Sequence, residues 1–80
     1  MADFPSLRAS QLLRILQREP LGYRIVRARG SHRVLVADGR PRIIFAFHGS
    51  RDVPGWMVRR VLVDQAGMAE PEALAMLGRP

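Results

Sequence analysis

The chain of 80 residues contains no cysteine, which excludes a disulfide framework and any metal site built on thiolates. Lysine, asparagine and threonine are absent as well. The longest apolar runs, such as residues 43–47, are far too short to span a bilayer. Residues 1–8 include Asp3 and Pro5 and form no apolar signal core, so we expect no secretion signal and a cytoplasmic location.

Positive charge is the strongest global feature of the sequence. All 13 basic residues are arginines, and the formal net charge is +6. The flat donor fork of arginine matches phosphate and stacks on bases, so a field of this sign suits RNA or DNA. It suits an acidic protein partner equally well, and the arginine bias also fits a simple effect of genomic nucleotide composition.

The length and the hydrophobic content predict one small globular domain spanning residues 1–80. Hydrophobic residues make up 48% of the chain, which is too many for a disordered segment. A chain this short buries a limited core, so much of its surface is available for binding.

The hydrophobic periodicity predicts a first helix over residues 7–18. Its apolar residues share one helical face, namely Ala9, Leu12, Leu13 and Leu16. Ser6 or Ser10 would cap the helix, and the pattern does not choose between them. Pro20 and Gly22 end it.

Three strands are predicted next, over residues 23–29, 32–37 and 42–47. Gly30 marks the first turn, and Asp38-Gly39 is a strong hairpin signal. Pro41 fits an edge position. Because both turns are short, the three strands should form an antiparallel sheet with the second strand in the middle.

Two helices complete the predicted order α-β-β-β-α-α. After a loop containing Gly49 and Ser50, the first of them starts at Asp52 or Val53 and ends near Ala66, with Gly67 as its stop. Its apolar side comprises Pro54, Met57, Val58, Val61, Leu62 and Ala66. A short third helix covers residues 70–77. The pattern therefore predicts an α+β fold in which helices cover one face of the sheet and function lies on the open face.

Three segments in this order resemble the HicA toxin family. They are Gly30-Ser31-His32, the strand Arg42–His48 and the helix Val58–Gly67, which is similar to the pattern Leu-Arg-x-Ile-Leu-x-x-Ala-Gly. The chain departs from the family where Ala46 replaces a common proline, where the loop after His48 is slightly short, and at Trp56 and Met57. The resemblance implies a double-stranded-RNA-binding-domain-like fold.

The resemblance also implies an activity and a partner. HicA toxins are type II toxins that cleave mRNA independently of the ribosome, with no cofactor, and a HicB antitoxin encoded beside the toxin covers the active site. HicB often carries a DNA-binding domain that represses the operon. The alternative function is a non-catalytic RNA-binding module of the same fold, and a third is a dedicated protein-interaction subunit.

His32 is the central catalytic candidate, because a histidine titrates near neutral pH and serves as general base or acid in RNA cleavage. The alternative is a histidine that only supports its turn. His48 is the second candidate, against a simple capping or solvent-exposed role. A three-residue loop, Asp38-Gly39-Arg40, would place His32, Val34, Ile44, Ala46 and His48 together on the open face, whereas a two-residue loop would not. We favour three.

The strands also carry the candidate RNA-binding residues, which are Gly30, Ser31, Arg24, Arg27, Arg29, Arg33 and Arg42, with Arg40 in the same cluster. Contacts from these arginines to phosphates would position RNA. The alternative for the arginines is an ordinary solvated edge, and for Ser31 a turn-forming role.

The candidate antitoxin interface comprises Val34, Ile44 and Trp56. A tryptophan beside arginines is a typical interface anchor. A simpler interpretation, which we favour slightly, is that the third helix folds back and covers Trp56. No metal-ligand constellation is present, because Asp52 and Asp64 are too isolated to suggest a two-carboxylate site.

Overall fold

The computed structural model describes residues 3–46, 48 and 50–78. In chain order its elements are β1 (Leu7–Arg8), α1 (Ala9–Gln17), β2 (Arg24–Arg29), β3 (His32–Val36), β4 (Ile43–Ala46), β5 (Asp52–Val53), α2 (Gly55–Arg59), the π-helix η1 (Arg60–Gln65) and α3 (Glu70–Met76). The predicted α+β order is confirmed, with two short strands added to it. Phe47 and Gly49, which we expected in the third strand and the following loop, lie outside the described residues.

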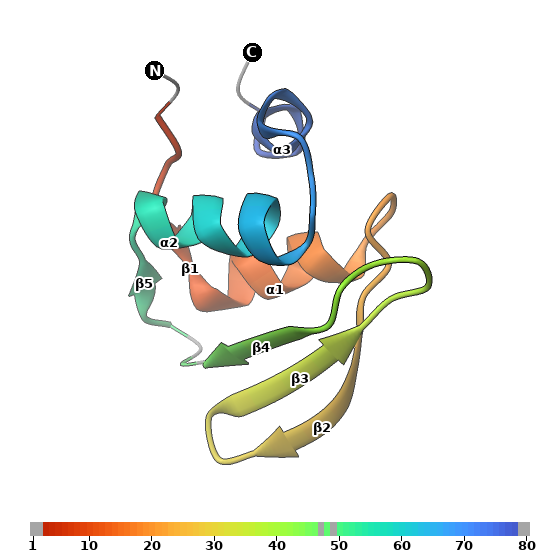
Figure 1. Ribbon diagram of the computed structural model, residues 1–80. Helices are drawn as coiled ribbons and strands as arrows, with labels where there is room; N and C mark the ends of the chain where they lie inside the picture. Colours follow the sequence, from red (N-terminus) through yellow and green to blue (C-terminus); the bar gives the residue numbers. More distant parts are fainter. Residues whose placement is uncertain (1–2, 47, 49, 79–80) are drawn as a thin grey trace.

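The main sheet is antiparallel with strand order β2-β3-β4, so the predicted central position of the second strand is confirmed. The helices lie on one side of this sheet, with α1 and α2 next to it and α3 farthest away (Figure 1). The opposite face of the sheet is left open, as the sequence predicted.

The hydrophobic core lies between the sheet and the first two helical segments. Its largest fully buried side chains are Leu12, Leu16, Leu35, Ile43, Leu62, Val58 and Val61. Within α1 the buried face also includes Ile15, whereas Leu13, which we assigned to that face, only packs against it from the side. Pro54 was wrongly placed on the apolar side of the second helix, because it is exposed at the helix start.

The starts of the first two helices differ from the prediction, because Leu7–Arg8 and Asp52–Val53 are extended. Leu7 pairs with Val53 and Arg8 with Asp52 in a small antiparallel sheet, and the Ala9 N–H donates to the Arg51 carbonyl at 2.9 Å. Neither predicted serine caps α1. Instead Arg8 is the N-cap, and its backbone N–H donates to Gln11 Oε1 at 2.9 Å.

The predicted second helix is one continuous helical segment that changes its hydrogen bonding part-way. It begins as an α-helix at Gly55 and continues as the π-helix Arg60–Gln65. At its end the Ala66 N–H donates to the Val61 carbonyl at 2.9 Å, five residues back. Gly67 follows with a φ of 79°, which confirms it as the C-terminal stop. A side chain at Gly55 would collide with the Phe4 carbonyl, so glycine permits the N-terminal segment to pack closely there.

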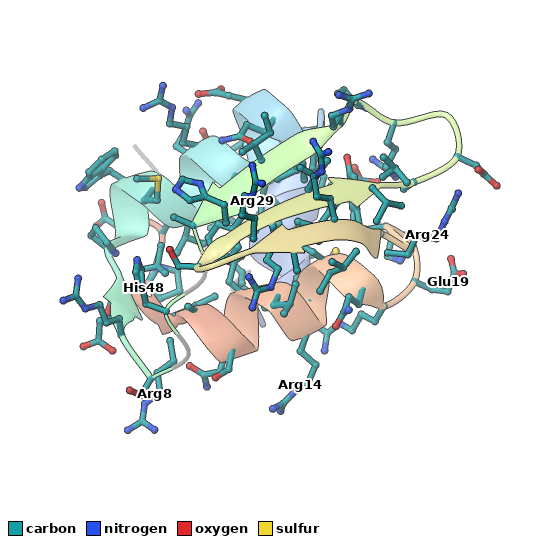
Figure 2. All side chains as sticks on the ribbon, turned by 90° about the horizontal axis from the view of Figure 1, so that it is seen from below. Arg8, Arg14, Glu19, Arg24, Arg29 and His48 are labelled. Carbon is teal, nitrogen blue, oxygen red and sulfur yellow. The ribbon has the colours of Figure 1, made fainter. Side chains whose placement is uncertain are left out.

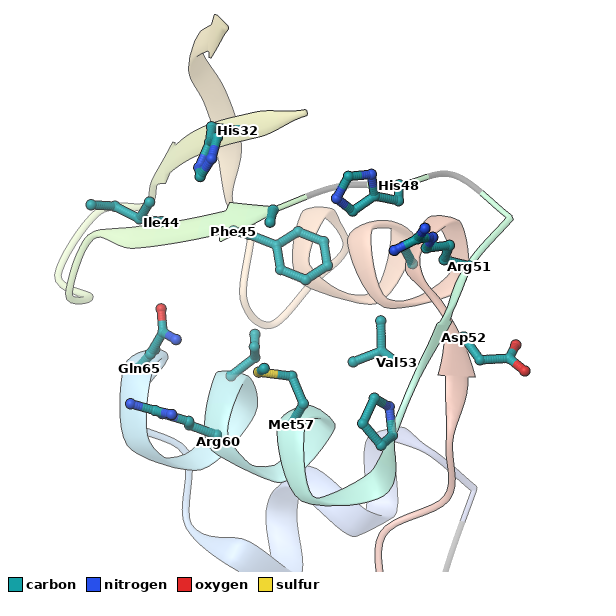
Figure 3. A pocket seen from close by; sticks show the side chains of 14 residues that line it. His32, Ile44, Phe45, His48, Arg51, Asp52, Val53, Met57, Arg60 and Gln65 are labelled. Carbon is teal, nitrogen blue, oxygen red and sulfur yellow. The ribbon is translucent and has the colours of Figure 1, made fainter. Parts of the chain in front are cut away.

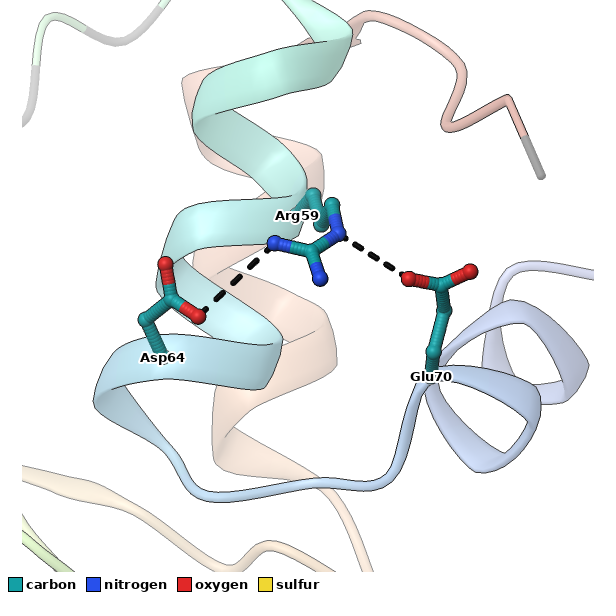
Figure 4. Close-up of polar contacts among 3 residues, drawn as sticks. All are labelled: Arg59, Asp64 and Glu70. Carbon is teal, nitrogen blue, oxygen red and sulfur yellow. Dashed lines mark hydrogen bonds and ion pairs between the residues drawn. The ribbon is translucent and has the colours of Figure 1, made fainter. Parts of the chain in front are cut away.

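Helix α3 buries Ala73 and Leu74, and charged groups also link it to the preceding helix. Arg59 Nε donates to Glu70 Oε2 at 3.0 Å, and its guanidinium also lies 3.7 Å from Asp64 (Figure 4). Arg18 donates to the Met76 carbonyl at 2.8 Å from α1. The expectation that α3 covers Trp56 was wrong, because the Trp56 side chain is 63% exposed.

Tyr23 joins the start of β2 to the segment before β4. Its ring is buried, and its hydroxyl donates to the Pro41 carbonyl at 2.7 Å. Burial raises the pKa of Tyr23 above its ordinary value, an effect that the nearby Arg40 guanidinium partly opposes. The phenol is therefore held in the neutral form that donates this hydrogen bond.

We predict that Tyr23→Phe lowers the free energy of unfolding by about 1 kcal/mol, because the Pro41 carbonyl loses its donor. Urea denaturation at neutral pH measures the change. Since the folded protein holds the phenolic proton more tightly than the unfolded chain, wild-type stability should also fall as the pH rises above about 10, where a tyrosine in the unfolded chain ionises. Tyr23→Phe should reduce this alkaline loss, and an unchanged loss would contradict the assignment.

Candidate functional site

The register of the β3–β4 hairpin places His32 on the open face of the sheet. His32 pairs with Ala46 and Val34 with Ile44, and all pairs are centred on Gly39. A three-residue turn, Asp38-Gly39-Arg40, would place the same side chains on each face of the hairpin. The paired residues nearest the turn are Leu35 and Ile43. The alternate residues Leu35, Ile43 and Phe45 face the core and are buried.

Strand β2 extends this face with a row of arginines. Arg29 pairs with His32 and Arg27 with Val34, so both arginines project from the same side of the sheet as their partners. All three arginines of β2 are exposed. Figure 2 views the sheet from the side that the helices leave open, with Arg24 and Arg29 at the two ends of the strand.

A β-bulge at Val26 brings Arg24 onto the same face. Arg24 pairs with Val36, but the register shifts between Ile25 and Arg27. Without the extra residue, Arg24 and Arg27 would point to opposite faces, because they are an odd number of positions apart. The sequence pattern contained no signal for this bulge.

Two other predicted RNA-binding arginines lie away from this row. Arg33 alternates to the core side of the sheet and donates to the Gly30 carbonyl at 2.6 Å and the His32 carbonyl at 3.1 Å. Arg42 is exposed just before β4. Arg33 therefore stabilises the turn between β2 and β3. This turn consists of the two residues Gly30 and Ser31, and Gly30 has a φ of 57°.

A groove of about 430 Å³ runs between β4 and the α2–η1 helix. The sheet side contributes His32, Ile44, Phe45, Ala46 and His48, and the helix contributes Met57, Arg60, Val61 and Gln65. Figure 3 shows His32 and His48 on the sheet side and Gln65 pointing toward β4 from the helix. The two predicted catalytic histidines therefore border one groove.

The segment around β5 closes one end of this groove with Arg51, Asp52, Val53 and Pro54. Arg51 lies beside His48, whereas the Asp52 carboxylate points away (Figure 3). Because β5 is fixed to β1, the small two-stranded sheet determines where this end of the groove lies. Arg51, Arg60 and Gln65 were not among the predicted site residues.

The charges around the site are mostly positive. Arg24 lies 4.0 Å from Asp38, and both side chains are largely exposed, so this ion pair contributes little to stability. Within residues 3–46, 48 and 50–78, no group of three or more His, Asp or Glu side chains is arranged to hold a metal ion. The ionisable side chains that line the groove are His32, His48, Arg51, Asp52 and Arg60.

Residues 9–68 match the family model described as HicA toxin of bacterial toxin-antitoxin. This match covers most of the chain. The protein belongs to the HicA toxin family. No curated protein and no solved structure matched the chain significantly. Of the helices in the described part of this HicA family member, none has the length and hydrophobicity needed to cross a membrane.

Proposed function

We propose that this HicA toxin is an endoribonuclease that cleaves mRNA without a metal ion, on a fold of the double-stranded-RNA-binding type. The observation that carries the proposal is the position of His32 and His48 on one side of the same groove, beside a row of arginines. Two imidazoles at one site supply both the base and the acid that RNA cleavage requires.

The proposed reaction uses the RNA's own 2′-hydroxyl as nucleophile. One imidazole takes the proton of the 2′-hydroxyl as its oxygen attacks the adjacent phosphorus. The bond from phosphorus to the 5′-oxygen breaks, and the other imidazole, in its protonated form, gives that oxygen a proton. The products are a 2′,3′-cyclic phosphate and a 5′-hydroxyl. His32 is assigned the central role because it begins β3 directly after the Gly30-Ser31 turn, and Arg33 donates to the carbonyls of Gly30 and His32 on either side of Ser31.

The arginines of β2 are proposed to hold the RNA backbone. Arg29 stands directly across the ladder from His32, and Arg27 stands one row farther along. Guanidinium groups bind phosphates in a bidentate manner, and such contacts fix the position of a strand without reading its sequence. The row therefore aligns the scissile phosphate with the histidines, with Gly30 and Ser31 forming the adjoining turn.

We predict that the purified protein cleaves single-stranded RNA in the presence of EDTA. His32→Ala should slow cleavage by about a hundredfold or more, and His48→Ala should also impair it, because general acid–base groups contribute on this scale. Gel analysis of a labelled RNA measures the rates, and circular dichroism checks the folding of each variant. Full activity of His32→Ala would exclude the catalytic assignment, and RNA binding without any cleavage would favour the non-catalytic RNA-binding module.

We predict a steep salt dependence of RNA binding in the inactive His32→Ala protein, since phosphate contacts release counterions. Adding Arg27→Ala should lower the slope of log K against log salt concentration by about one. Arg14→Ala is the matched control, because Arg14 is exposed on α1, away from the sheet (Figure 2). Equal slopes for the two arginine variants would mean that RNA is not held on the β2 row.

The partner is proposed to be a HicB-like antitoxin that occupies the open face. Ile44 and Trp56 are 62% and 63% exposed, and Val34 beside Ile44 is half-buried. Exposed aromatic and aliphatic side chains of this size are typical interface anchors, while the arginines attract an acidic partner. An antitoxin bound here would cover His32 and exclude RNA.

We predict that coexpression of the neighbouring antitoxin gene rescues growth and yields a complex of toxin and antitoxin that copurifies. Added antitoxin should displace labelled RNA from the inactive His32→Ala toxin. Trp56→Ala should weaken this complex by about 2 kcal/mol, mainly through faster dissociation. Gln17→Ala is the control, because Gln17 is exposed at the end of α1 and lies on none of the elements of the proposed interface. A stable ternary complex with RNA would show that the antitoxin does not act by occlusion.

A further inference from the structure

The wall of the groove opposite the histidines carries two polar side chains with no role in the proposed chemistry. They are Arg60 and Gln65, which begin and end the π-helix η1. Gln65 is half-buried and points toward β4, on the side where Ile44 and His32 lie (Figure 3). Across the described part of the chain, neither side chain makes a hydrogen bond or ion pair with another residue.

Neighbouring arginines on this helix have different environments. Arg59 is bound by Glu70 and Asp64 on the side of the helix that faces α3 (Figure 4). Arg60, the next residue, is exposed and lines the groove instead. The helix therefore neutralises one guanidinium within the fold and presents the other to whatever enters the groove.

The groove between these walls has the size and lining of a site for a flat, partly apolar group. Its volume of about 430 Å³ lies in the range of small-ligand sites. Phe45, Met57 and Val61 provide an apolar floor, while Arg51 and Arg60 add positive charge at its margin. This combination suits a nucleobase whose flanking phosphates remain at the charged margin.

We propose that the groove holds one unstacked base of the RNA beside the cleavage site, and that Gln65 reads the edge of this base. The proposal rests on the proposed ribonuclease function and extends it to base selection. A glutamine amide offers both a donor and an acceptor, which is the pair needed to distinguish base edges. Arg60 binds the phosphate next to that base. Gln65 is thus a specificity-determining residue and takes no part in proton transfer.

The spacing of side chains along the helix explains why Gln65 reaches the groove. Met57, Val61 and Gln65 follow one another at intervals of four residues, and side chains four residues apart share one helical face. All three line the groove. Gln65 is the last of this row, at the end of the π-helix η1.

The test compares cleavage positions in a random-sequence RNA pool for the wild type, Gln65→Leu and Gln65→Glu. The wild type should prefer certain bases at one position beside the cut. Gln65→Leu keeps the side-chain size but removes both hydrogen-bonding groups, so it should reduce that preference on the order of tenfold by lowering cleavage beside the preferred base toward the level seen beside the others. Gln65→Glu replaces the donor with an acceptor and should change which base is preferred.

The matched control is Gln17→Leu, which makes the same chemical change at an exposed position at the end of α1. It should leave the preference unchanged. Wild-type cleavage positions retained in both Gln65 variants would overturn the proposal, as would a loss of cleavage at all sequences in variants that fold normally. An effect of Gln65→Leu on antitoxin affinity alone would instead assign the groove to the protein partner.

A binding measurement separates this proposal from the ribonuclease function. Fluorescence anisotropy of His32→Ala with short oligoribonucleotides of A, C or U should show a preference for one of them. Adding Gln65→Leu should reduce that preference on the order of tenfold. If the wild type cleaves no RNA, the ribonuclease function fails, yet the binding preference still tests the role of Gln65. If binding shows no preference that depends on Gln65, base reading fails regardless of cleavage.

Discussion

The hydrogen-bonded ladder between β3 and β4 is the constraint on which the functional surface depends. It pairs His32 with Ala46 and holds Leu35 and Ile43 fully buried against the helices. A slip of β3 by one residue would turn Leu35 toward water and move His32 toward the core, so burial of the apolar side chains holds the register. The packing of the core therefore determines the position of His32 on the open face.

A strand bulge and a row of helix side chains then complete the surface that this ladder begins. The bulge at Val26 adds Arg24 to the row that already contains Arg27 and Arg29. It inserts one residue into the strand and so changes which neighbouring side chains face the ligand side, and bulges are enriched near functional sites for this reason. From the opposite wall, Met57, Val61 and Gln65 line the groove at intervals of four residues on one helical face.

The distribution of arginines separates structural from functional charge. Arg59 links α3 to the second helix, Arg18 binds the Met76 carbonyl, and Arg33 supports the turn before His32. The arginines of β2, in contrast, lie exposed on the open face. They add to the attraction for a polyanion that the net charge of +6 gives the whole chain. An antitoxin that covered this face would need acidic groups for the same arginines, so the proposed substrate and the proposed inhibitor would compete for one set of contacts.

The order of the main helices and strands and the central position of the second strand were predictable from the sequence, because hydrophobic periodicity and turn residues act locally. The sequence favoured a three-residue Gly39 hairpin but left its parity open, because a change of one residue in the loop reverses the faces. Family membership also followed from local motifs around His32. The pairing of β1 with β5 was not predictable, because it joins residues far apart in the chain that have no strong strand signal of their own. The same holds for the groove, since Arg51, Arg60 and Gln65 meet the histidines only when the second helix packs beside β4. The sequence determined the main helices and the three strands of the larger sheet. Only tertiary packing decided the small β1–β5 sheet and which side chains face one another, because both depend on contacts between distant segments.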